Sequence, residues 1–139
     1  MMKIIFGSRT LQLTPYERHN EPDYYDWISV WIEYSLPEFK TLYKAAFTVY
    51  ELSQLRTGLT NIYQSMLTST ESPPVHFNSM ERMMDISFMK NYPEHVEVNL
   101  VLRPEDHAES IVVTDTFYLD HSYFPALLSG LDQIINWQN

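Results

Sequence analysis

The sequence predicts an α+β fold: one meandering, mostly antiparallel sheet of about six or seven strands, with two helices packed on one face. Two observations support this fold class. Several stretches alternate apolar and polar residues with a period of two, which is typical of strands buried on one face only. Two other stretches repeat apolar residues every three or four positions, as amphipathic helices do.

The first third of the chain is expected to contain four strands. Residues 3–6 and 9–13 flank a Gly-Ser turn, and the polar, proline-containing residues 14–26 are expected to form a long loop. Residues 27–34 and 41–47 alternate regularly between their two faces and are separated by a proline. This pattern predicts a β-hairpin.

Two helices are expected, each with a recognisable first turn. Thr48 and Glu51 form a capping box at the start of the first helix, which the Ser-Pro-Pro sequence at residues 72–74 ends. Ser122 is the expected N-cap of the second helix, because it leaves Pro125 in the first turn, where a missing N–H costs nothing. The apolar stripes of the two helices consist of Leu52, Leu55, Leu59, Ile62 and Met66, and of Phe124, Leu127, Leu131 and Ile134.

Between the helices, three strands are expected at residues 83–89, 96–103 and 111–119. A turn at residues 91–94 and a charged loop at residues 104–109 separate them. No internal repeat and no linker is visible, so we expect a single domain over residues 1–139. No apolar run reaches roughly 20 residues and no signal-peptide pattern is present, which favours cytoplasmic residence.

The chain is strongly acidic. Eighteen acidic residues against nine basic ones give a formal charge of −9, and residues 94–120 contain seven of the acids but only Arg103 in opposition. This balance argues against binding to nucleic-acid phosphates or to an anionic membrane. It favours a basic protein partner, unless the acidity serves only to keep the protein in solution. The absence of cysteine excludes disulfides and zinc–thiolate sites.

No catalytic or metal-binding constellation is evident in the sequence. Asp120, His121 and Ser122 have the residue types of a hydrolase triad, but adjacent side chains point in different directions and cannot converge. The five histidines lack ligand-type spacing, and three glycines cannot form a phosphate-binding loop. We therefore expect no enzymatic activity, no cofactor and no metal.

Two carboxylate positions have alternative interpretations. Glu81 and Asp85 are about 13 Å apart along one strand face, too far for a retaining glycosidase pair, so a solvated surface is expected. Asp115 interrupts the apolar series of its strand. We expect it at a bulge or a sheet edge, where water reaches it. The alternative is a buried carboxylate with a raised pKa, which would indicate a functional site.

The aromatic residues of the strand at 27–34 are the most informative candidates for binding. Trp27 and Trp31 share one face of this strand, and Glu33 lies on the same face. If that face is open, the two tryptophans form an exposed aromatic patch of the kind that anchors protein interfaces. The alternative is that a loop, such as the segment at residues 16–26, covers them.

Three segments carry a resemblance to a known family: Trp-Ile-Ser-Val-Trp-Ile at residues 27–32, Tyr-Glu-Leu at 50–52, and Tyr-Leu-Asp-His-Ser-Tyr-Phe at 118–124. In these segments the chain resembles the WapI-type immunity proteins, small bacterial proteins that protect a cell from a contact-delivered toxin. It departs from that pattern at Pro73 and Pro74 and lacks glycine-containing turns between its later strands. The resemblance implies inhibition by binding and brings no catalytic residues.

The leading hypothesis is an immunity-like inhibitor that covers a basic surface of a toxin domain, often a nuclease. The alternative is another protein-interaction module or a self-associating subunit, which a homodimer burying both tryptophans would favour. An enzyme would instead need a deep pocket that gathers Asp115, a histidine and a hydroxyl. The residues expected to bind the partner are Trp27, Trp31, Glu33, Glu97, Glu105, Asp106 and Glu109.

Overall fold

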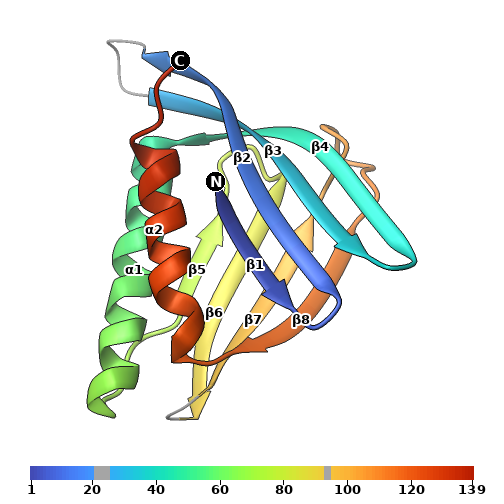
Figure 1. Cartoon of the computed structure of the whole chain (residues 1–139). Helices are drawn as coiled ribbons and strands as arrows, with labels where there is room; N and C mark the ends of the chain where they lie inside the picture. Colours follow the sequence, from blue (N-terminus) through green and yellow to red (C-terminus); the bar gives the residue numbers. More distant parts are fainter. Residues whose placement is uncertain (21–25, 93–94) are drawn as a thin grey trace.

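The structure, a computed structural model, describes residues 1–20, 26–92 and 95–139. This part of the chain forms eight strands, two α-helices and one short 3-10 helix (Figure 1). Their bounds are β1 (Met2–Phe6), β2 (Arg9–Asn20), β3 (Asp26–Leu36), β4 (Phe39–Thr48), α1 (Val49–Thr68), β5 (Val75–Asn78), β6 (Met84–Tyr92), β7 (His95–Leu102), β8 (Val113–Leu119), η1 (His121–Tyr123) and α2 (Phe124–Ile135).

The α+β class is confirmed, but the prediction of one meandering sheet is wrong. The strands form two four-stranded sheets, β1-β2-β3-β4 and β5-β6-β7-β8, and every neighbouring pair is antiparallel. Alternation reports that one face of each strand is buried, and two packed sheets satisfy it as well as one sheet does. The first strand of the second sheet, β5, was not predicted because it has only four residues.

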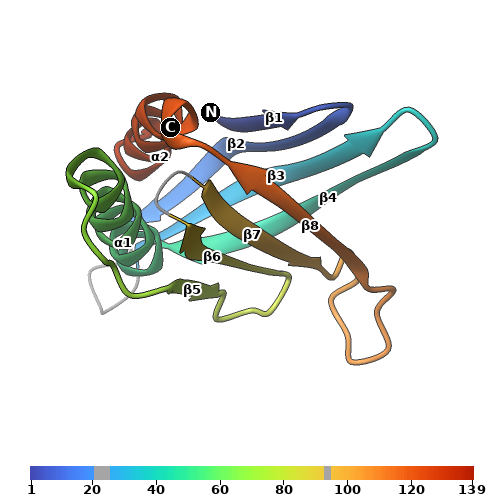
Figure 2. The same cartoon turned by 90° about the horizontal axis from the view of Figure 1, so that it is seen from below.

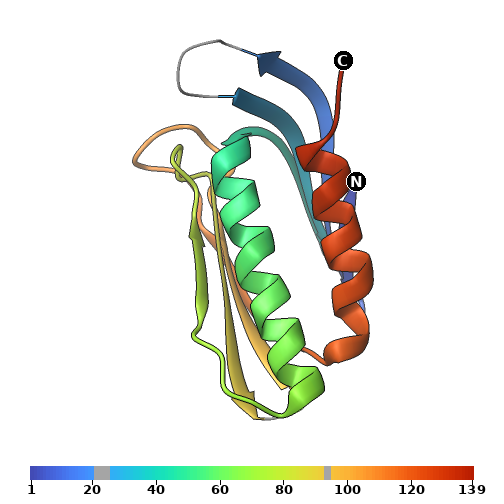
Figure 3. The ribbon, with the colours of Figure 1, turned by 90° about the vertical axis from the view of Figure 1, so that its left-hand side faces the viewer.

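The order of four antiparallel strands followed by a helix occurs twice, although the sequence shows no repeat. Each helix packs on the first strand of the other half, α1 on β5 and α2 on β1. Figure 3 shows the two helices side by side along one side of the two sheets. In both contacts the helix approaches the strand closely at a glycine. A Cβ atom on Gly130 would lie 2.8 Å from the Cα of Met2, and one on Gly58 would lie 2.7 Å from a methyl group of Val75.

The inner faces of the two sheets and the buried stripes of both helices form one hydrophobic cluster. Figure 2 shows the two sheets as separate layers with both helices at one side. Three polar side chains, Asp115, Tyr34 and Arg9, link the two sheets. Asp115 of β8 accepts a hydrogen bond from the Tyr34 hydroxyl, and Arg9 Nε lies 2.5 Å from its Oδ2, although that N–H is not aimed for a hydrogen bond. Burial, and then the Asp115 contact, raise the pKa of Tyr34 to about 12. Asp115 therefore does lie on an edge strand, as expected, but protein groups rather than water satisfy it.

Local sequence signals predicted most element ends. The capping box of Thr48 and Glu51 is present in both directions. The prediction that Ser122 caps the second helix is wrong. The Asp120 carboxylate accepts from the N–H and the hydroxyl of Ser122 and so caps η1, whereas α2, which follows directly, has no side-chain cap but does have Pro125 in its first turn. The predicted loop at residues 14–26 is wrong as far as residue 20, since β2 continues along β3 through a bulge between Pro15 and Glu17.

Some predicted features lie outside the described residues. They are the remaining part of the predicted loop, residues 21–25, and the end of the turn at residues 91–94, residues 93–94. Among the described helices, none combines the length and the apolar character needed to cross a membrane.

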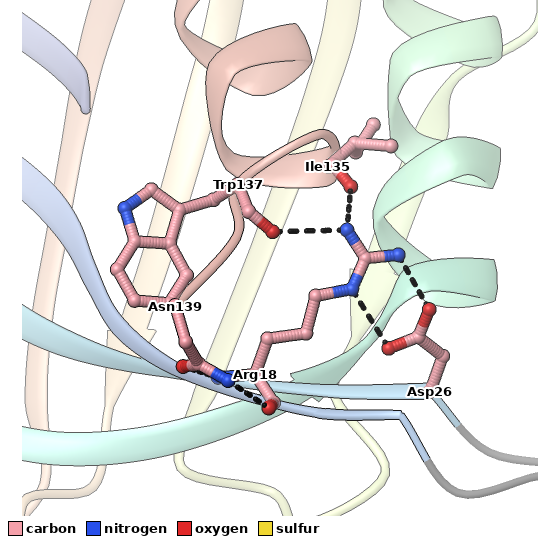
Figure 4. A network of polar contacts seen from close by, with 5 residues as sticks. All are labelled: Arg18, Asp26, Ile135, Trp137 and Asn139. Atoms are coloured by element: carbon pink, nitrogen blue, oxygen red, sulfur yellow. Dashed lines mark hydrogen bonds and ion pairs between the residues drawn. The ribbon is translucent and has the colours of Figure 1, made fainter.

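A strand residue caps the C-terminus of each helix. Arg18 of β2 donates from Nη1 to the carbonyl oxygens of Ile135 and Trp137, both at 3.0 Å, while Asp26 holds the other edge of its guanidinium group (Figure 4). Lys90 of β6 likewise donates to the carbonyl oxygen of Ser65 at the end of α1. A cation at these positions satisfies the last carbonyls and interacts favourably with the helix dipole.

We expect Gly130→Ala to lower the free energy of unfolding by about 1 to 2 kcal/mol, because overpacking against the backbone of β1 outweighs the gain in helix propensity. Gly58→Ala presses on a side chain instead, so it should recover stability when combined with Val75→Ala. Urea denaturation of the single and paired variants measures both effects. A Gly130→Ala variant as stable as the parent would contradict the close approach.

Candidate partner-binding surfaces

The structure distributes the predicted partner-binding residues over three surfaces. One is the outer face of the first sheet, the side turned away from the core. The second is the outer face of the second sheet, and the third is the loop between β7 and β8. These surfaces contain, respectively, Trp27, Trp31 and Glu33; Glu97; and Glu105, Asp106 and Glu109.

Trp31 is exposed on the outer face of the first sheet, with 36% of its surface accessible. Its ring contacts that of Tyr16, with 5.7 Å between ring centroids. Lys44 Nζ lies 5.0 Å from the centroid of Trp31 and 5.6 Å from that of Tyr16, within cation–π range. Tyr16 of β2 and Lys44 of β4 therefore flank Trp31, and no loop among the described residues buries it.

The charge of this face differs from the expectation. Three of the four lysines of the chain, Lys3, Lys40 and Lys44, project from it. The carboxylate of Glu33 forms an ion pair with Lys40 at 3.0 Å, so its charge is already compensated. The aromatic patch of Trp31 and Tyr16 consequently has a lysine, Lys44, beside it, although the protein as a whole is acidic.

Trp27 is half-buried and lines a shallow hollow at the end of the same face. The other residues around the hollow are His19, Ser29, Ala46 and Glu81. Glu81 belongs to the turn between β5 and β6, so this hollow brings the first sheet next to a turn of the second.

The loop between β7 and β8 is organised by its own hydrogen bonds. The carboxylate of Glu105 accepts from the N–H of Ile111 at 3.0 Å and contacts His107 Nε2 at 3.3 Å. These two contacts, the first being the larger, lower the pKa of Glu105. Asp106 and Glu109 are exposed on the same loop. Glu105 thus has a structural role, whereas its two acidic neighbours project into solvent.

Glu81 lies close to other carboxylates. Its pKa is raised, first by partial burial and then by the negative charges of Asp106 and Glu51. A shallow hollow that also includes Arg82, Arg103 and Glu105 lies between its turn and the β7–β8 loop. Arg103 forms an ion pair with Asp85 at 2.8 Å, and within the described residues neither Glu81 nor Asp106 has a cation within ion-pair distance. We call Glu81, Glu105, Asp106 and Glu109 the acidic end.

Glu97 lies apart from the acidic end. It is the third residue of β7, five residues before that strand ends at Leu102, which corresponds to about 17 Å along the strand. The amide of Asn99 donates to its carboxylate at 3.3 Å. Its cross-strand neighbours are Met89 and Tyr118, both exposed. A partner at the acidic end therefore would need a large footprint to reach Glu97.

Comparison with known proteins identifies the family. The sequence model of the immunity protein WapI-like family matches residues 3–139. The chain belongs to this family. Since immunity proteins neutralise toxins, membership in the WapI-like family indicates a protein partner. No curated protein matches the chain.

One solved structure, that of WHY3 from Arabidopsis thaliana, is similar with a TM-score of 0.48 and 11% sequence identity. The match covers 96% of this chain and 84% of that one. A similarity at this level supports no functional argument.

In this WapI-like protein the residue types that suggested other chemistry have structural contacts. Asp120 caps η1 by accepting from Ser122, and the contacts of Asp115 are Arg9, Tyr34 and the N–H of Thr116. Among the described residues, no group of three His, Asp or Glu side chains is placed to hold a metal ion.

Sequence reasoning missed Glu81, Tyr16 and Lys44 as surface residues of interest. The alternation of β4 could have placed Lys44 beside Trp31, because the predicted hairpin fixes that face. Tyr16 was assigned to a loop. The prediction that Glu81 shares a strand face with Asp85 is wrong, because Glu81 lies in the turn before β6. The carboxylates around it come from distant parts of the chain, so the sequence could not indicate them.

Replacing Glu81 by Gln removes a charge that its surroundings disfavour. Because the pKa of Glu81 is raised in the folded protein, the ionised carboxylate opposes folding at every pH above that pKa. We expect Glu81→Gln to raise the free energy of unfolding by about 0.5 kcal/mol at neutral pH. The gain should disappear as the pH falls through the raised pKa to the ordinary value of 4.5.

The matched control is Glu109→Gln, which changes an exposed glutamate of the adjoining loop. Urea denaturation at several pH values measures both variants. A Glu81→Gln variant that gains no more stability than Glu109→Gln at neutral pH would contradict the inference that burial and nearby carboxylates disfavour the ionised form of Glu81.

Proposed function

We propose that this WapI-like protein neutralises its toxin by direct binding, and that the acidic end meets a basic surface of the toxin domain. A nuclease fits this description, because the surface that receives nucleic-acid phosphates is basic. Carboxylates that occupy the places of phosphates would exclude the substrate. The inhibitor then needs no chemistry of its own, only complementarity and a slow rate of dissociation.

The observation that carries this proposal is that Glu81 and Asp106 lie close together and neither has an ion pair among the described residues. Partial burial, and then the charges of Asp106 and Glu51, raise the pKa of Glu81. In the free protein these charges repel one another, so their proximity opposes folding. A basic partner would reverse the sign of the interaction at the same place. The unfavourable free energy of the isolated cluster thus becomes favourable in the complex.

The acidic end also offers apolar contact area. Ile111 and Val112, next to the loop acids, are 66% and 53% exposed, and Met80, next to Glu81, is 54% exposed. Protein interfaces combine a buried apolar centre with a polar rim, and the apolar centre supplies most of the affinity. The carboxylates would then set the rate of encounter and the orientation, while these aliphatic side chains anchor the complex.

The long-range field favours the same surface. The second half of the chain, residues 71–139, contains eleven acidic and three basic residues. The acidic end lies within this half, so a basic partner is attracted toward it before contact. Such steering weakens as salt screens the charges, with a screening length of about 10 Å at 0.1 M salt.

The test begins with a tagged pull-down at low salt, followed by mass spectrometry and recombinant expression of the captured protein. We expect the double variant Asp106→Lys/Glu109→Lys to weaken binding to that protein roughly 10- to 100-fold and to reduce the salt dependence of the affinity. Both residues are exposed, so the fold should be retained. Glu105 is left unchanged because it organises the loop.

The matched control is Glu38→Lys/Glu71→Lys, which makes the same change in net charge at two exposed glutamates outside the acidic end. Titration calorimetry at two salt concentrations compares the variants. If both double variants weaken binding equally, only the net charge matters and the proposed surface is wrong.

A further inference from the structure

The outer face of the first sheet has a repeating arrangement across its strands. In the pairing register, Trp27 stands opposite His19, and two positions further along β3 Ser29 stands between Glu17 and Ala46. Two positions beyond that, Trp31 stands between Thr14 and Lys44. A row formed by Glu17, Ser29 and Ala46, with small residues on β3 and β4, therefore separates two rows that each contain a tryptophan.

The two tryptophan rows differ in shape and charge. Trp31 protrudes with Lys44 over its ring. The Trp27 row is hollowed, with Ser29 and Ala46 as part of the lining and Glu81 on its rim. One row thus presents an aromatic and cationic projection, and the other presents a hollow bounded by a carboxylate.

We propose that this face binds a second copy of the chain around a two-fold axis that crosses the strands at Ser29 and Ala46. Such an axis exchanges the two rows on either side of it. Trp31 of each copy enters the hollow beside Trp27 of the other, and Lys44 of each meets Glu81 of the other. The contact is isologous, which means that both copies use the same face. Assembly therefore stops at two copies.

The charges of the face support a second copy as the occupant. Among the described residues, Arg9, Arg18, Arg56 and Arg103 each have an aspartate partner and Lys90 is held at the end of α1. Lys44 has no carboxylate within ion-pair distance, and Glu81 has no cation. Lys44 and Glu81 are thus two charges of opposite sign without an ion pair among the described residues, and they lie on either side of the row that would hold the axis.

The size of the face sets the strength of the contact. Four strands at about 4.8 Å spacing and nine residues of β3 at about 3.4 Å per residue give a face of about 600 Å² per copy. Two copies would bury about 1,200 Å², the lower limit for a specific interface. Each copy also has a formal charge of −9. We therefore expect a reversible dimer, not an obligate one.

Sedimentation velocity over a range of protein concentrations tests the proposal with the protein alone. The wild-type mass should rise with concentration from 16.5 kDa toward twice that value. Trp31→Ala removes the projection, and Lys44→Glu places like charges opposite each other. Each change should weaken the dimer at least roughly tenfold. Lys3→Glu makes the same charge change on β1, outside the exchanged rows, and should have little effect.

Exchanging the charges of Lys44 and Glu81 tests the proposed contact most directly. Glu81→Lys alone should weaken the dimer, because it places two lysines opposite each other. An equimolar mixture of Lys44→Glu and Glu81→Lys chains should form a heterodimer, because one contact is then the original Lys44–Glu81 pair and the other joins the introduced glutamate to the introduced lysine. The double variant Lys44→Glu/Glu81→Lys should recover self-association. Circular dichroism and thermal unfolding verify that each variant is folded.

A wild-type protein that stays monomeric at the highest concentration reached would overturn the proposal. So would a dimer that Trp31→Ala and Lys44→Glu leave unchanged, because it would use another surface. Failure of the double variant to recover would overturn the proposed axis. None of these measurements involves the toxin, so the proposed function stands or falls separately.

Discussion

The arrangement depends on the close packing of each helix against the first strand of the other half of the chain. Gly130 lets α2 approach β1, and Gly58 lets α1 approach β5. These contacts hold both sheets against one hydrophobic cluster and place both helices on one side of it. The outer faces of the sheets and the turns at their ends remain exposed. Those are the surfaces where the candidate binding residues lie.

The surface charges that matter for binding are those left over after the fold has used the others. Four arginines pair with aspartates, and Lys90 caps a helix. Those that remain include Glu81, Asp106 and Glu109 of the acidic end, Arg82 next to Glu81, and Lys44 beside Trp31, none of which has an ion pair among the described residues. Because Glu81 belongs to both proposed surfaces, a basic partner and a second copy of the chain would compete for it. The family match indicates that one partner is a protein.

The sequence predicted features that depend on neighbouring residues. The capping box at Thr48, both helical stripes and the hairpin at residues 27–47 have local signatures, and the structure contains them. The division into two sheets was missed because alternation does not identify the partner of a buried face. The extension of β2 was missed because Pro15 and its polar neighbours resemble a loop. The clustering around Glu81 could not be predicted, since Glu51, Glu81 and Asp106 meet only through the tertiary fold.

The central claim is that the protein binds its partner through the acidic end. Hydrogen–deuterium exchange of the protein, alone and with the captured partner, locates the contact without altering any residue. The account predicts that the partner slows exchange in the β5–β6 turn at residues 79–83 and in the β7–β8 loop at residues 104–112. Slower exchange confined to the outer face of the second sheet or to the helices, with both of these segments unchanged, would contradict it.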